Sequence, residues 1–107
     1  MFTFIESGIF ERELPHYLDD EEYTALQWFL MSHPEAGDVI PGAGGVRKLR
    51  WKRPGSGKRG GVRVIYYVRY RPDELWMLTL YAKAKQGSIP ARVARALKER
   101  FLNDSQT

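Results

Sequence analysis

The feature that most constrains the fold is a pair of alternating segments separated by a glycine-rich stretch. From Val46 to Arg53, apolar and basic residues alternate, so that Leu49 and Trp51 fall on one side of the chain. A second alternating segment runs from Val62 to Tyr70, after the stretch 54–61 with its four glycines. Period-two alternation predicts strands with one apolar and one polar face, and the glycine-rich connection predicts that they pair as an antiparallel hairpin.

Two further strands complete the predicted sheet. Segment 75–82 is nearly all apolar, which is typical of a central strand covered on both faces. Apolar residues at positions 2–5 predict a short opening strand. With helices before and after the hairpin, the order predicts a single α+β domain over residues 1–107. We expect a twisted, mainly antiparallel sheet with the N-terminal helices and the C-terminal helix packed on one of its faces.

Helices are predicted before and after these strands along the sequence. Residues 10–18 favour a helical turn or a short helix, and the acidic pair 19–20 offers N-cap side chains for the next helix. Pro34 ends that helix, because proline disfavours helical geometry in the residue before it. A last helix begins near Ser88 and has an apolar stripe at i, i+4 and i+8, formed by Val93, Leu97 and Phe101. The polar tail 103–107 is expected to fray.

Positive charge is concentrated in one third of the chain. Between Val39 and Pro72 there are ten Lys or Arg residues and no Asp or Glu, although the whole chain has 17 basic and 13 acidic residues. A surface that binds a polyanion is typically rich in cations and lacks acidic residues, because each cation near a phosphate releases a condensed counterion. The alternative is a solvated basic hairpin that aids solubility or meets an acidic protein.

Alternation also predicts which residues share the open side of the sheet. Apolar residues are expected to face the helices and the residues between them to face away. In the last strand this rule directs Trp76, Leu78 and Leu80 to the helices, and Met77 and Tyr81 away from them. Across the three strands it gathers four cations and one phenol on the open face: Lys48, Arg50, Arg63, Tyr81 and Lys83. The polar half of an ordinary amphipathic sheet would also carry such residues, although it would be expected to mix positive and negative charges.

Composition argues against several other classes of protein. The chain has no cysteine, which excludes disulfides and thiolate metal sites and fits a reducing cytoplasm. No apolar run is long enough to span a bilayer, and the N-terminus does not resemble a secretory signal. His16 and His33 stand apart from the basic region, so we expect no metal site and no cofactor. The glycine-rich stretches 42–45 and 54–61 lack the residues of a dinucleotide fingerprint or a P-loop and are interpreted as turns.

Three blocks of sequence stand in a characteristic order, at Asp38–Arg50, Gly57–Tyr67 and Leu78–Lys83. With Phe4–Ser7 and Asp20–Tyr23, they cover nearly the whole chain. In this order they resemble the HigB branch of the RelE/ParE superfamily of bacterial toxins. The resemblance implies a RelE-like fold and the activity of a ribosome-dependent endoribonuclease that cuts mRNA in the A site. It also implies a cognate antitoxin encoded beside the toxin, HigA-like with a helix-turn-helix domain, and no membrane partner.

The resemblance also implies roles for individual residues. By position, the catalytic groups fall on Lys48, Arg50, Arg63 and the region of Tyr81 and Lys83. The reaction is a metal-independent attack by the RNA 2′-hydroxyl on the adjacent phosphate, which leaves a 2′,3′-cyclic phosphate. Some members have an arginine directly after the position of Lys83, where this chain has alanine, and a further tyrosine that this chain lacks. The identity of the general acid and of the general base is therefore left open.

Further residues of the basic region are expected to grip the RNA backbone or stack on a base: Arg47, Lys52, Arg53, Lys58, Arg59 and Tyr67. Three alternatives to the interferase remain. A ParE-like chain would inhibit a protein target such as gyrase and cleave nothing. A non-catalytic binder would hold RNA or DNA on the same face, and an inactive relative would have lost the reaction.

Overall fold

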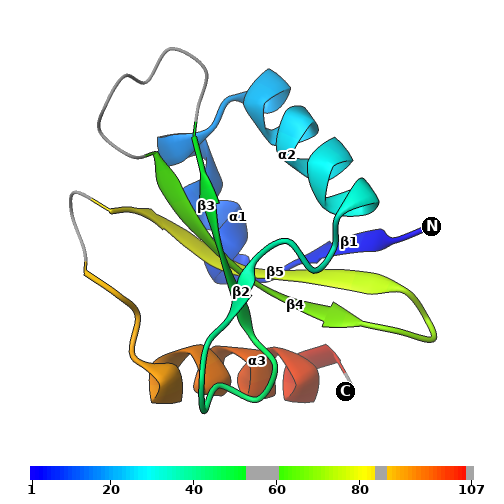
Figure 1. The fold of residues 1–107 in the computed structure, drawn as a ribbon, viewed down its shortest axis with the longest axis vertical. Helices are drawn as coiled ribbons and strands as arrows, with labels where there is room; N and C mark the ends of the chain where they lie inside the picture. The colour runs from blue at the N-terminus through cyan, green and yellow to red at the C-terminus, as the bar shows by residue number, and fades with distance from the viewer. Residues whose placement is uncertain (53–60, 84–86, 106–107) are drawn as a thin grey trace.

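The protein is described by a computed structural model that covers residues 1–52, 61–83 and 87–105. Five strands form one mixed sheet in the order β1-β5-β4-β3-β2, in which β1 pairs parallel with β5 and the other neighbours pair antiparallel. The elements in chain order are β1 (Thr3–Glu6), α1 (Gly8–Tyr17), α2 (Asp20–Ser32), β2 (Asp38–Val39), β3 (Arg47–Trp51), β4 (Val62–Arg69), β5 (Glu74–Ala82) and α3 (Ala91–Ser105). This confirms the predicted α+β class (Figure 1).

Side-chain caps fix the beginnings of the first two helices. The Ser7 hydroxyl accepts a hydrogen bond from the backbone N–H of Phe10 and donates one to the Leu78 carbonyl, which ties α1 to β5. Asp19 and Glu22 form a reciprocal capping box at the start of α2, with both hydrogen bonds at 2.8 Å. The predicted N-cap of α2 is therefore confirmed at Asp19.

The helices cover both faces of the sheet, so the prediction that they all pack on one face is wrong. On one face, α1 and α2 contribute Phe10, Leu26 and Leu30 to a core with strand residues such as Val64. On the other face, α3 and the loop before β3 bury a second set that includes Ile65, Trp76, Leu78 and Ala94. Figure 1 shows α2 and α3 on opposite sides of the strands. The apolar character of β5 on both faces already required this second layer.

A β-bulge in β5 changes the direction of its side chains. Ile65 is opposite Thr79 while the next residue, Tyr66, is opposite Met77, so Leu78 is an extra residue on β5. Before the bulge, the prediction from alternation is wrong, because Met77 lies in the core under α1 and α2 while Trp76 and Leu78 lie under α3. After the bulge, Leu80 and Tyr81 have the predicted directions.

A buried tyrosine holds the connection between α2 and β2. Tyr66 is fully buried, and its hydroxyl donates to the Pro34 carbonyl at 2.8 Å and accepts from the Gly37 N–H at 2.9 Å. Burial raises the pKa of Tyr66 above its ordinary value. A Cβ on Gly37 would lie 2.8 Å from the Tyr66 ring, so this contact requires glycine.

The C-terminal helix is longer than the sequence suggests. Helix α3 extends through Ser105, so residues 103–105 are helical, while 106–107 lie outside the described residues. Fraying of this tail stays a prediction. Its first turn is held by the Pro90 carbonyl, which accepts from the N–H groups of Val93 and Ala94. Within the described part of the chain, no helix is long and apolar enough to cross a membrane.

Candidate nucleic-acid interface

A row of side chains crosses three neighbouring strands on the face that α1 and α2 do not cover. Arg50 of β3 is directly opposite Arg63 of β4, and Arg63 is directly opposite Tyr81 of β5. Lys48 lies two residues before Arg50 and therefore points to the same side of β3. Like charges directly opposite one another destabilise a sheet. The fold itself therefore has no electrostatic reason to place these two arginines side by side.

This row lines a pocket of about 240 Å³. The end of β5 and the segment before α3 complete the lining, which consists of Lys48, Arg50, Arg63, Tyr81, Lys83, Gly87 and Ser88. Four of these seven residues are cationic and none is acidic. The structure thus brings together in one pocket all five residues that the sequence predicts to be catalytic.

Burial differs sharply among the pocket residues. Arg63 and Tyr81 are each only 6% exposed, whereas Arg50 and Lys83 are exposed and Lys48 is half-buried. The expectation that Arg63 lies open to solvent is therefore wrong, because Arg63 is enclosed in the pocket between Arg50 of β3 and Tyr81 of β5. A guanidinium held in such a place keeps a fixed position and a fixed charge.

The Tyr81 hydroxyl is the second unusual group. Its oxygen is buried and makes no hydrogen bond to any other group in the described part of the chain. A buried hydroxyl without a partner costs about 1–3 kcal/mol, so such groups are rare and call for an explanation. Because Tyr81 lines the pocket beside Arg63, a ligand oxygen in the pocket would supply the missing partner.

The chemistry of this lining suits a phosphate group. A planar guanidinium binds two phosphate oxygens at once, and ammonium groups add positive charge without a fixed direction. Tyrosine and serine hydroxyls donate hydrogen bonds to the same oxygens. Fixed donors around a phosphoryl group stabilise the negative charge that grows on it during transfer. The pocket is therefore equipped to bind a phosphodiester and to stabilise its transition state.

Arg47, predicted to contact RNA, has a structural role in this fold. It alternates with Lys48 and lies on the other side of β3, where its guanidinium donates to the carbonyls of Glu35 at 3.1 Å and of Gly37 at 2.8 Å. These hydrogen bonds brace the segment between α2 and β2. Arg47 therefore does not line the pocket, and its assignment to the RNA-binding set stays a prediction.

Tyr67, predicted to stack on a base, is partly buried and packs under α3. Its ring lies 5.6 Å from the Trp76 ring, and the Lys98 ammonium lies 4.8 Å from its centre. Lys98 also donates to the Gly44 carbonyl at 2.8 Å, so helix and loop cover the tyrosine together. Sequence alternation placed Tyr67 on the correct face but could not show that α3 occupies this part of it.

The other predicted RNA contacts lie near or beyond the end of the described strand. Lys52 follows β3, is exposed, and does not line the pocket. Arg53, Lys58 and Arg59 lie outside the described residues, so their prediction as RNA contacts is untested.

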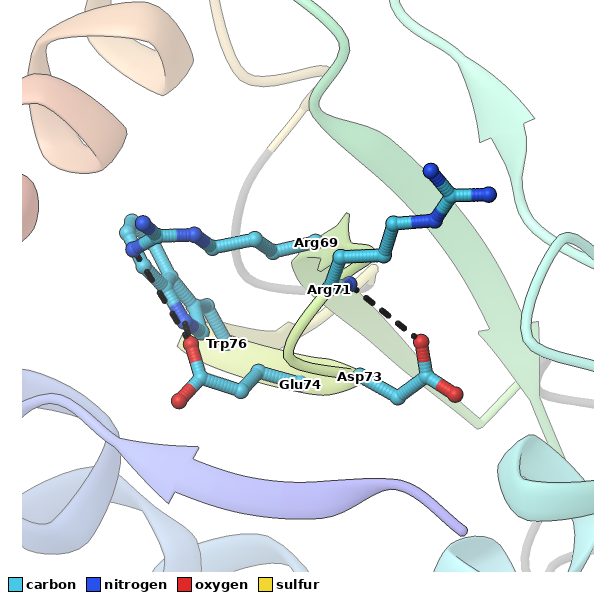
Figure 2. A network of polar contacts seen from close by, with 5 residues as sticks. All are labelled: Arg69, Arg71, Asp73, Glu74 and Trp76. Carbon is cyan, nitrogen blue, oxygen red and sulfur yellow. Dashed lines mark hydrogen bonds and ion pairs between the residues drawn. The ribbon is translucent and has the colours of Figure 1, made fainter.

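Two cations of the basic region belong to the opposite end of the sheet. At the turn between β4 and β5, Arg69 lies 4.0 Å from the Glu74 carboxylate and 5.4 Å from the centre of the Trp76 ring. The Trp76 indole donates to the same carboxylate at 3.0 Å, and the backbone N–H of Arg71 points to Asp73. Figure 2 shows the Arg69 guanidinium on Trp76 and Glu74, with the Arg71 side chain pointing away.

Sequence reasoning missed two pocket residues, Gly87 and Ser88. The last helix was expected to begin near Ser88, but it begins at Ala91 and the Pro90 carbonyl serves its first turn. The only sequence signal for Ser88 as a pocket residue was its position, five residues after Lys83 and just before the helix. Only the fold shows that the chain returns here to the open face.

No group of three His, Asp or Glu side chains that would hold a metal ion occurs among residues 1–52, 61–83 and 87–105. A scan of the chain against protein-family models finds no match. Functional assignment therefore depends on the pocket and on the resemblance of the sequence blocks.

Proposed function

We propose that this chain is the toxin of a toxin–antitoxin system and cleaves mRNA on the ribosome, in the cytoplasm. The observation that carries the proposal is the pocket in which a buried arginine and an unpartnered buried tyrosine hydroxyl stand between three further cations. The resemblance to the HigB branch supports the choice of mRNA as the substrate. Its antitoxin is a HigA-like protein with a helix-turn-helix domain.

In the proposed reaction, the 2′-oxygen of the RNA forms a bond to the adjacent phosphorus and the bond to the 5′-oxygen breaks. The 2′-hydroxyl proton passes to a base, and the departing 5′-oxygen takes a proton from an acid. Arg63 holds two oxygens of the phosphoryl group, while Lys48 and Arg50 bind the flanking backbone. Either Lys48 or Lys83 is the base, because both amines belong to the pocket lining. Tyr81 donates a proton or a hydrogen bond.

A second candidate is a non-catalytic nucleic-acid binder that uses the same pocket. It is favoured by the absence of His, Asp and Glu from the described lining, since these are the common general bases near neutral pH. Such a chain would bind RNA with a steep dependence on salt and would leave it intact.

Purified protein added to translating ribosomes tests the proposal. We expect codon-dependent cuts in the A site with 2′,3′-cyclic phosphate ends, in the presence of EDTA, and arrest of growth when the chain is expressed alone. Binding without cuts would favour the second candidate. Loss of DNA supercoiling activity without RNA cuts would point instead to a gyrase inhibitor. A short helix-turn-helix gene next to this one would support the toxin–antitoxin assignment.

A further inference from the structure

The charges of this molecule are segregated beyond the basic pocket. Residues 1–38 contain nine of the 13 acidic residues and one of the 17 basic residues. This segment includes α1 and α2, whose inner residues pack on the sheet face opposite the pocket. The helical layer is therefore strongly acidic, and its outer surface is turned away from the proposed RNA site.

An exposed tryptophan lies on this acidic layer. The side chain of Trp28 is 65% exposed, while Leu26 and Leu30 of the same helix are fully buried. Trp28 lies one turn beyond Thr24 and Ala25, and one more turn leads back to Glu21, so these residues form one outward stripe of α2. They border a shallow, open depression of about 460 Å³ whose lining is Asp20, Glu21, Thr24, Ala25 and Trp28.

We propose that this stripe of α2 is a docking surface for a cationic amphipathic helix of a partner protein. Exposed tryptophan is the residue type most enriched at binding hot spots, and fixing it costs little because it has few rotatable bonds. The small side chains of Thr24 and Ala25 allow a second helix to approach closely. The carboxylates of Asp20 and Glu21 at one end of the stripe select lysine or arginine at the matching end of the partner.

The position of this surface predicts how the partner acts. Helix α2 contacts β3 and β4 through the first core, and the pocket lies on the other face of those strands. A helix bound over Trp28 therefore leaves the pocket open to its ligand. The docking surface serves recruitment rather than blockage, and this inference does not depend on the reaction proposed for the pocket.

A synthetic helical peptide serves as the probe. It spans about four helical turns, with leucine at i, i+3, i+4 and i+7 and lysine at the other positions. The control peptide has the same composition in an order without an apolar stripe. Titration calorimetry gives the affinity, and backbone amide NMR shifts locate the bound peptide on the full chain.

We expect the amphipathic peptide to shift amides of α2 around Trp28. We expect Trp28→Ala to weaken it by about tenfold or more, and Glu21→Gln to weaken it less. Val93→Ala, which trims a 37% exposed residue on α3, is the matched control and should leave affinity unchanged. Because Trp28 is exposed, its truncation should barely alter the melting temperature.

Equal affinity of the two peptides, equal affinity of Trp28→Ala and the unaltered chain, or NMR shifts centred outside α2 would overturn the proposal. So would the failure of the peptide to bind at millimolar concentration. Sedimentation of the protein alone tests whether a second copy of the chain occupies this surface. If it self-associates and Trp28→Ala abolishes this, the surface binds a second copy and the partner-helix proposal is wrong.

Discussion

The two ends of the β4–β5 pair differ in whether their cationic side chains have partners within the protein. At the turn end, Arg69 has the Glu74 carboxylate and the Trp76 ring beside it. At the pocket end, the side chains of Arg50 and Lys83 make no hydrogen bond or ion pair with another described residue, and the lining contains no acid. Arg50 and Arg69 belong to the same run of ten cations between Val39 and Pro72, and Lys83 follows that run.

Folding therefore separates cations that have a partner within the protein from cations that remain available to a ligand. Paired charges and satisfied hydrogen bonds are the normal state of a folded chain, and departures from it concentrate at functional sites. The unpartnered hydroxyl of Tyr81 lies at the pocket end as well. The same contrast should appear when each end is altered.

The larger effect of the two tyrosine variants should come from Tyr81→Phe, which removes the buried hydroxyl and keeps the ring. We expect mRNA cleavage to fall by about a hundredfold, because a positioned proton donor contributes on that order. The melting temperature should stay the same or rise, because the hydroxyl makes no hydrogen bond within the described chain. Single-turnover cleavage and a thermal melt measure the two quantities; a less stable protein that still cleaves would show that Tyr81 is structural.

Tyr66→Phe should give the reverse pattern. Its hydroxyl bonds both Pro34 and Gly37 in a buried setting, so its loss leaves the Gly37 N–H without its partner. We expect the free energy of unfolding to fall by about 2 kcal/mol, with cleavage per folded molecule unchanged. Urea unfolding gives the first value. A large loss of cleavage in folded Tyr66→Phe would break the contrast between the two tyrosines.

Arg50→Ala should weaken RNA binding by about tenfold at moderate salt, since it removes an exposed cation from the pocket. The slope of log affinity against log salt should decrease by about 0.7–0.9, the contribution of one phosphate contact. Arg71→Ala, at the turn end, is the control and should leave the slope unchanged. Equal slopes for the two variants would mean that the RNA does not distinguish the two ends.

The smallest effect is expected from Glu74→Gln at the turn end. The amide oxygen can still accept from the Trp76 indole, and the partly exposed pair with Arg69 contributes little. We expect the free energy of unfolding to change by at most about 0.5 kcal/mol and cleavage to stay unchanged. Added salt should reduce even this difference. A drop in cleavage would link the turn end to the reaction.

Much of the pocket could be predicted from sequence because alternation within a regular strand is reliable. Lys48, Arg50 and Arg63 alternate with apolar residues of β3 and β4, and the structure places all three on the predicted face. Tyr81 lies on that face only because the bulge at Leu78 shifts the alternation of β5 by one residue. The residues of β5 before the bulge were misplaced for the same reason, since a bulge leaves no clear mark in an all-apolar segment.

The contacts that sequence reasoning could not supply join segments far apart in sequence. The role of Tyr67 depends on where α3 packs, and that of Arg47 on the carbonyls between α2 and β2. Ser88 joins the pocket because the chain returns to the open face after β5. Local patterns cannot supply such pairings, because each depends on the arrangement of three or more elements.

A matched pair of arginines on β4 tests the central claim most directly. Arg63 and Arg69 lie on one strand, at the pocket end and the turn end respectively. We expect Arg63→Ala to lower single-turnover cleavage of A-site mRNA by at least about a hundredfold, or roughly 3 kcal/mol. Arg69→Ala should change it by no more than about threefold, since a surface pair contributes under about 1 kcal/mol.

Because Arg63 is buried, the folded fraction of each variant must be measured by thermal melting and cleavage expressed per folded molecule. Arg63→Lys, which keeps the charge but not the planar guanidinium, is the second variant and should also be impaired. If folded Arg63→Ala cleaves at the rate of the unaltered chain, or if Arg69→Ala loses as much activity, the pocket is not the site of cleavage.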